Sequence, residues 1–174
     1  MQTKVNLFCN LMLFCIFSFD YGNQAFGQDK VNMSVGIGLP ELLNIGVRYQ
    51  LDQTQIGISF GSIPGNDIIS ISSDVYYHFG GFSELSNRRP WYGKVGLNYF
   101  RDETETIIDQ YIYLNLQVGR DINISEKIGI EIDAGAIFQL SREKIRKKPS
   151  SGWLDFDLEF PVLPSVGIGV FYRI

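Results

Sequence analysis

Alternation between apolar and polar residues recurs along this chain and constrains its fold more than any other feature. The first such stretch runs from Val31 to Leu39 and places an apolar residue at every second position. Successive side chains of a β-strand point to opposite faces, so this period of two predicts a strand with one apolar face. The pattern returns in later segments and predicts strands at residues 31–39, 45–51, 55–61, 69–79, 91–99, 111–118, 128–140 and 165–174.

The lengths and compositions of these segments favour a membrane barrel over a soluble sandwich. Several segments approach the ~9–11 residues that a tilted strand needs to cross a bilayer. One face of each is almost entirely apolar, while the other carries Gly, Ser, Asn and Tyr with few charges, unlike a face turned to water. Aromatic residues gather toward the strand ends, as in the girdles of membrane barrels. They are Tyr49, Phe60, Tyr77, Phe79, Trp91, Tyr99, Phe138 and Tyr172.

The number of predicted strands is even, which puts both ends of a closed sheet on the same side of a membrane. Closure also removes the unpaired edges that an open sheet would expose. We therefore predict an all-β fold, a closed eight-stranded antiparallel up-and-down transmembrane β-barrel. The alternative from another class is a soluble lipocalin-like carrier, in which the alternation is inverted and the apolar faces line the interior.

The N-terminal segment has the layout of a secretory signal peptide. Lys4 precedes an apolar run over residues 5–19, and Ala25 and Gly27 supply small residues for cleavage before Gln28. The run is short for a membrane-spanning helix. We predict a cleaved signal peptide at 1–27 and a barrel domain at 28–174. Cys9 and Cys15 both lie in the leader, so the mature chain lacks disulfides and cysteine nucleophiles.

The leader, the repeated alternation and the last strand together resemble the small outer-membrane β-barrels of the OmpA membrane-domain and OmpX type, a porin-like family of Gram-negative bacteria. In that family the last strand ends in an aromatic residue and is read by the barrel-insertion machinery. The residues that fit this insertion signal are Val166, Ile168, Val170 and Tyr172, whereas the terminal Ile174 departs from its strict form. The resemblance implies a location in the outer membrane, with membrane lipid, the insertion machinery and periplasmic chaperones as partners.

Charged residues also occur on the polar faces of the predicted strands, which turn toward the barrel interior. Charges shielded from water must be paired or hydrated. The set is balanced in sign and consists of Arg48, Lys94 and Arg173 against Asp74, Glu131 and Asp133. It predicts an internal ion-pair network that plugs the lumen, because eight strands leave little more room than side chains fill. A narrow ion path lined by the same groups is the alternative.

The sequence offers little material for catalysis. The single histidine, His78, shares a predicted face with Ser70, Ser72 and Asp74, but all four lie along one strand, which does not assemble a nucleophile, base and acid. We expect no enzyme activity, no catalytic residues, no metal and no cofactor, with a lipid-modifying enzyme as a less favoured alternative. A net charge of −4 argues against nucleic acid as a partner.

The connections between the predicted strands indicate which segments face outward and could contact a partner. Inner turns are expected at 52–54, 80–90 and 120–126, and outer loops at 40–42, 62–67, 102–110 and 141–164. In the last loop, basic Arg142, Lys144 and Arg146 face acidic residues beyond a turn at 149–152. A protruding ribbon that pairs them with Glu159, Asp157 and Asp155 is one interpretation, and a solvated loop is the other. Candidate contact residues for an external partner are Arg142, Lys144, Arg146, Trp153 and Phe156. The expected function is a structural or surface-interaction scaffold, with a narrow pore as the alternative.

Overall fold

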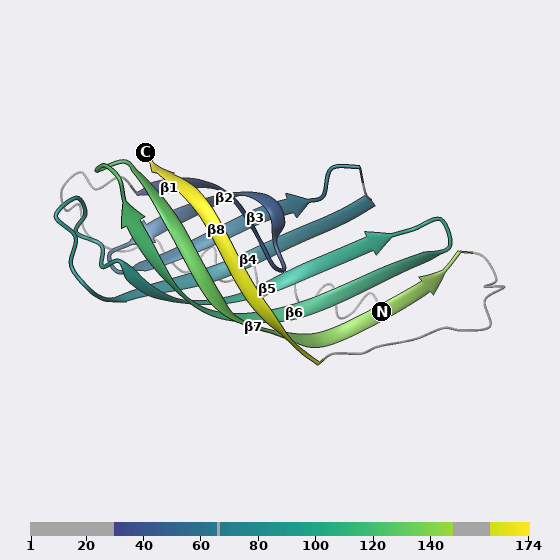
Figure 1. The fold of residues 1–174 in the computed structure, drawn as a ribbon. Coiled ribbons are helices and arrows are strands. Elements are labelled where there is room, and N and C mark those ends of the chain that lie inside the picture. Colours follow the sequence, from purple (N-terminus) through teal and green to yellow (C-terminus); the bar gives the residue numbers. More distant parts are fainter. Residues whose placement is uncertain (1–29, 66, 148–160) are drawn as a thin grey trace.

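The computed structural model describes residues 30–65, 67–147 and 161–174, and these form a closed barrel (Figure 1). Each strand pairs antiparallel with its neighbour in sequence, and the first strand pairs with the last. This confirms the predicted all-β, closed, antiparallel, up-and-down fold. The strands are β1 (Val31–Gly38), β2 (Leu42–Leu51), β3 (Thr54–Ser62), β4 (Asp67–Gly80), β5 (Trp91–Glu103), β6 (Ile107–Asn123), β7 (Ile128–Arg146) and β8 (Val162–Arg173).

The barrel turns its apolar faces outward and its polar faces inward. Ile45 is 62% exposed and Val166 is 60% exposed, although both are aliphatic. Asn32, Asn98 and Asn115, by contrast, are almost fully buried in the interior. A soluble carrier would need the opposite arrangement, because apolar surface is stable only away from water. The direction of the alternation therefore argues against the lipocalin-like alternative.

The strands differ in length, so the two ends of the barrel differ (Figure 1). At one end, which we call the even end, the strands finish at similar levels, and at the other, the extended end, some strands project beyond the rest. The even end carries the turns 52–53 and 124–127, the longer loop 81–90 and the C-terminal end of β8. At the other end β1 and β2 stop early, whereas β5, β6 and β7 continue well beyond them. We call this continuation the β5–β7 extension; it consists of residues 100–103, 107–113 and 139–146.

The predicted loops at 102–110 and 120–126 are largely wrong, since most of these residues are in strands. Asp102 pairs with Asp109, and Arg120 pairs with Ile132, so only 104–106 and 124–127 form the turns. Likewise, β7 continues to Arg146 inside the predicted loop 141–164. The loss of apolar alternation suggested loops, but backbone pairing depends on the neighbouring strand and not on apolar side chains.

A β-bulge in β7 decides which way the side chains of the β5–β7 extension point. Ile112 is opposite Ser141 and Tyr113 is opposite Gln139, which leaves Leu140 as the extra residue. One extra residue reverses the alternation that follows it. Arg142 is therefore opposite Tyr111, on the face that continues the lumen, whereas simple alternation from the outward Leu140 would have placed it outside.

Candidate functional site

The lumen contains a bidentate ion pair between opposite walls of the barrel. Arg48 of β2 donates from Nη2 to Glu131 Oε1 of β7 at 2.6 Å, and its Nη1 also contacts Glu131 Oε2. The guanidinium lies 4.4 Å from the ring centroid of Tyr76, a buried residue of β4. The two hydrogen bonds to the Glu131 carboxylate and the contact of the guanidinium with the Tyr76 ring satisfy most of the donors of Arg48. These two predicted interior residues are thus brought together.

Lys94, the second predicted cation, pairs with a residue that sequence reasoning assigned to an outer loop. Its Nζ donates to Glu41 Oε1 at 2.5 Å, and both side chains are buried. Glu41 belongs to the turn 39–41 between β1 and β2, which folds into the lumen. Ser70 donates to the carbonyl of Pro40 at 3.0 Å, and Ser165 donates to that of Leu39 at 2.5 Å. We call residues 39–41 the outer plug.

Gly61 makes room for the outer plug and is the sequence signal that marks it. A Cβ atom at this position would lie 1.6 Å from the carbonyl oxygen of Glu41. Only glycine permits the backbone of the turn to approach β3 so closely. Alternation alone places Gly61 on the inner face, but it does not say which segment approaches it.

A second plug enters from the even end. Arg88, in the loop 81–90, is 8% exposed and donates from Nη2 to Asp121 at 2.6 Å and from Nη1 to Gln50 at 2.9 Å. Its guanidinium lies 5.2 Å from the ring centroid of Phe171. We call this residue the inner plug. Sequence reasoning missed it because Arg88 and Asp121 were both assigned to turns.

The remaining predicted interior charges do not join one continuous network. Arg173 donates to Asn123 Oδ1 at 2.5 Å and to the carbonyl of Glu126 at 2.7 Å, at the even end of the barrel. Asp133 accepts from Tyr92 at 3.3 Å. Asp74 is buried, and its Oδ1 makes no hydrogen bond. Asp74 and Asp133 nevertheless line the same small cavity as Lys94.

That internal cavity is too small for a passage. Its volume is about 30 Å³, room for two or three water molecules at roughly 10–15 Å³ each. Large side chains fill the lumen, among them Tyr76, Tyr92 and Phe171, and glycines on the neighbouring strands leave space for two of these rings, Gly119 for Tyr92 and Gly129 for Phe171. A wider, open cavity of about 330 Å³ lies at the even end, between the β2–β3 turn, the loop 81–90, Glu126 and Arg173. Between the two, the Arg88 contacts close the described lumen.

The residues weighed for catalysis are held apart. His78 Nδ1 lies 2.7 Å from the carbonyl oxygen of Arg89, and its Nε2 lies 3.4 Å from Gln55 Oε1. Ser70 and Ser72 instead accept hydrogen bonds from Asn98 at 2.7 Å each. No hydrogen bond joins the histidine to either serine. Within the described ranges, no group of three or more His, Cys, Asp or Glu side chains is placed to hold a metal ion.

The β5–β7 extension carries an aromatic cluster on the face continuous with the lumen. Tyr111 and Tyr113 stack with centroids 5.5 Å apart, and Phe100 meets each ring edge-on at 6.2 Å. Arg142 Nη2 lies 3.3 Å from Asp109 Oδ1, and its guanidinium lies 5.4 Å from the Tyr111 centroid. Lys144, opposite Asp109, shares this face.

Several predicted features lie outside the described residues. They are the leader 1–27, the contact candidates Trp153 and Phe156, and the proposed pairing partners Asp155, Asp157 and Glu159. The paired-ribbon interpretation of the last loop therefore stays a prediction. Arg146 lies at the end of β7, where it pairs in register with Ile107.

The outer surface forms an apolar belt around the barrel. All positions of the predicted insertion signal, Val166, Ile168, Val170, Tyr172 and Ile174, are exposed on it. Exposed aromatic residues lie at both edges: Tyr49, Tyr77, Phe79, Trp91 and Tyr172 toward the even end, and Phe60 and Tyr99 toward the extended end. The described residues include no helix that is long and apolar enough to cross a membrane.

The fold and its two faces define a class: a closed, eight-stranded, antiparallel up-and-down β-barrel with an apolar exterior and a polar, plugged interior. Among solved structures, the crystal structure of Neisserial surface protein A is similar to this chain, with a TM-score of 0.45 and 12% identity over 83% of this chain and 94% of that one. No protein-family model matches, and no curated protein matches in sequence.

Proposed function

We propose that this protein is an outer-membrane β-barrel that anchors itself by its apolar belt and presents the β5–β7 extension outside the cell. The observation that carries the proposal is the distribution of side chains, which is the reverse of that in a soluble protein. Exposed contiguous apolar patches on soluble monomers rarely exceed a few hundred Å². Here the apolar face of every strand is exposed, and Asn, Gln, Ser and charged side chains are buried instead. Such a surface is stable in the hydrocarbon of a bilayer.

The difference between the two ends of the barrel gives its orientation in the membrane. Outer-membrane barrels have short turns on the periplasmic side and longer loops outside. The even end carries the short turns 52–53 and 124–127, the start of β1 and the end of β8, which fits the periplasmic side. Its one longer loop, 81–90, directs Arg88 into the lumen. The extended end carries the long strands β5, β6 and β7 and the connection from 147 to 161. It is the end that a surface partner would meet.

A structural or surface-interaction role has more support than a pore. The lumen is blocked by the outer plug and by the inner plug, and its internal cavity holds two or three waters at most. The face of the β5–β7 extension offers the aromatic cluster of Phe100, Tyr111 and Tyr113, the kind of rigid side chain that dominates recognition surfaces. A small barrel of the OmpA or OmpX type that displays this surface is the function we infer.

Gel mobility and fractionation test the proposal. The unboiled, detergent-extracted protein should migrate faster than the boiled protein and should fractionate with the outer membrane. A protein that stays in the periplasmic fraction without a mobility shift would contradict the proposal. Planar-bilayer conductance then separates a plugged scaffold from a pore: the plugged lumen predicts no steady single-channel current, and a steady current would favour the narrow pore.

A further inference from the structure

Arg120 interrupts the apolar belt near the even end of the barrel. It lies on the outward face of β6 between Val118 and Ile122, both exposed apolar residues. Across the strands it is opposite Trp91 on β5 and Ile132 on β7, which are also exposed. An arginine on the lipid-facing surface costs about 2–4 kcal/mol at the bilayer midplane and roughly 0–1 kcal/mol near the interface. Its position therefore marks the rim of the belt, where a guanidinium meets headgroups.

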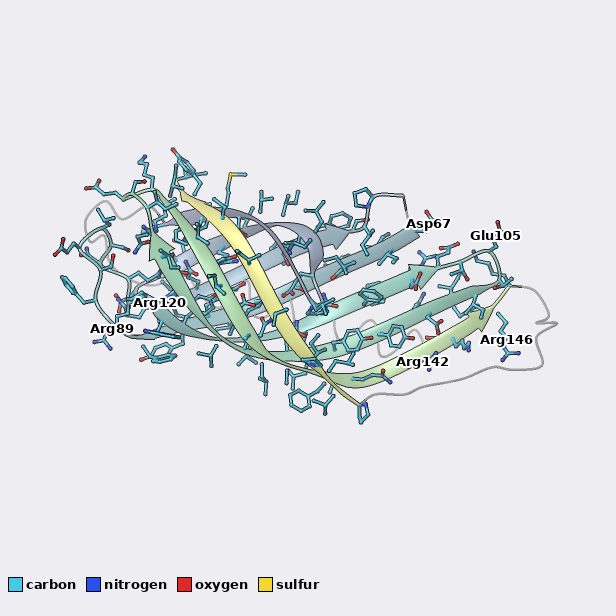
Figure 2. The ribbon with its side chains drawn as sticks, in the orientation of Figure 1. Asp67, Arg89, Glu105, Arg120, Arg142 and Arg146 are labelled. Atoms are coloured by element: carbon cyan, nitrogen blue, oxygen red, sulfur yellow. The ribbon has the colours of Figure 1, made fainter. Side chains whose placement is uncertain are left out.

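A second exposed arginine flanks the same tryptophan. Arg89 precedes Trp91 by two residues, and its Nη1 donates to the carbonyl of Phe79 at 3.0 Å, which leaves other guanidinium donors for a ligand. The guanidinium of Arg120 lies 5.4 Å from the Trp91 ring centroid. Figure 2 shows both arginines at the end opposite Glu105 and Arg146. We call Arg89, Trp91 and Arg120 the rim cluster.

The part of the chain that the structure describes supplies no paired carboxylate for the rim cluster. Among the described residues, no carboxylate forms an ion pair with Arg89 or Arg120. Three acidic residues of this end, Asp52, Glu84 and Glu126, instead line the open cavity of about 330 Å³ at the even end of the barrel. At the extended end the outward Arg101 is paired with Glu103 within the chain.

We propose that the rim cluster binds the phosphate headgroup of an anionic glycerophospholipid. A guanidinium matches a phosphate with two parallel hydrogen bonds. Trp91 sits at the headgroup level, as interfacial tryptophans do. This inference rests on the proposed membrane function, which turns the even end toward the inner leaflet, where the glycerophospholipids of an outer membrane lie. The result is a lipid-binding site on the outer wall of the barrel, separate from the lumen.

Quenching of Trp91 by brominated lipids tests the site. The sequence has two tryptophans, so a Trp153→Phe background leaves Trp91 as the sole reporter. The protein is reconstituted into phosphatidylcholine vesicles with increasing brominated phosphatidylglycerol, and separately with brominated phosphatidylcholine. We expect phosphatidylglycerol to be preferred at Trp91 by about fivefold for each arginine. The preference should disappear in Arg89→Gln/Arg120→Gln and persist in Arg101→Gln, the matched outward arginine at the opposite end.

The possible outcomes distinguish a failure of the lipid-binding proposal from a failure of the membrane-barrel proposal. Equal quenching by both lipids in a protein that shows heat-modifiable mobility overturns the lipid site and leaves the membrane barrel standing. A preference that survives in Arg89→Gln/Arg120→Gln also overturns it. Stronger displacement of brominated phosphatidylglycerol by lipid A than by unlabelled phosphatidylglycerol would refute the assignment to glycerophospholipid. If no brominated lipid quenches Trp91, the proposed membrane location itself fails.

Discussion

The ion pair between Lys94 and Glu41 provides the most direct test of how the lumen is held closed. The two side chains are 6% and 8% exposed, and 2.5 Å separates Nζ from Oε1. Asp74 and Asp133 line the same cavity, so three carboxylates share one ammonium, while Arg48 is engaged by Glu131. This imbalance predicts that the two partners of the pair are not equally costly to remove.

The replacement Lys94→Met should cost more than Glu41→Gln. Without the ammonium, three buried carboxylates remain with no cation of their own, and breaking a buried pair costs about 3–5 kcal/mol. Glu41→Gln keeps the shape of the outer plug and leaves Lys94 beside two other carboxylates. Its cost should be about 1–3 kcal/mol, the penalty for weakening one buried hydrogen bond. The double variant should lose less than the sum.

The free energy of unfolding is measured by urea titration in detergent micelles, with the folded fraction read from unboiled gel mobility. Glu143, an exposed carboxylate of the β5–β7 extension, provides the control: Glu143→Gln should stay within about 0.5 kcal/mol of the parent. If Glu41→Gln destabilised the barrel as much as Lys94→Met, the three carboxylates would not share the lysine, and this account of the lumen would be refuted.

Two further predictions concern the outer plug and the β5–β7 extension. Gly61→Ala places a methyl group against the Glu41 carbonyl and should destabilise the barrel by about 1–3 kcal/mol, whereas Gly93→Ala, which meets no atom within 4 Å, should be nearly neutral in the same urea titration; equal midpoints for the two variants would contradict the close approach. The hydrogen bond from Lys147 lowers the pKa of Glu103, so this carboxylate stabilises the fold above its unfolded pKa of about 4.3 and loses that effect as the pH falls through the lowered value. Glu103→Gln should therefore lower the melting temperature slightly at pH 7 and not at pH 3; an equal change at both values would rule out the ion pair as its cause.

The strands and the facing of their side chains were predictable because they depend on local alternation. Arg48 and Glu131 were both placed inward by counting along their own strands, and the structure joins them. The plugs were not predictable in this way, since Glu41 and Arg88 lie in connections. Whether a connection folds inward depends on groups far along the sequence, such as Lys94 and Gly61.

The bulge at Leu140 shows a second reason why alternation in the sequence does not always predict the direction of a side chain. The next four residues, 141–144, are polar on both faces, so a one-residue change of phase leaves no trace in their pattern. The phase is set by the pairing of β7 with β6, which brings Arg142 to Asp109 and Tyr111. Without the bulge, Arg142 would turn to the outer wall just above the apolar belt. The same residue thus contributes to the inner face of the β5–β7 extension only because of a long-range strand register, and the proposed recognition surface depends on that register as much as on its side chains.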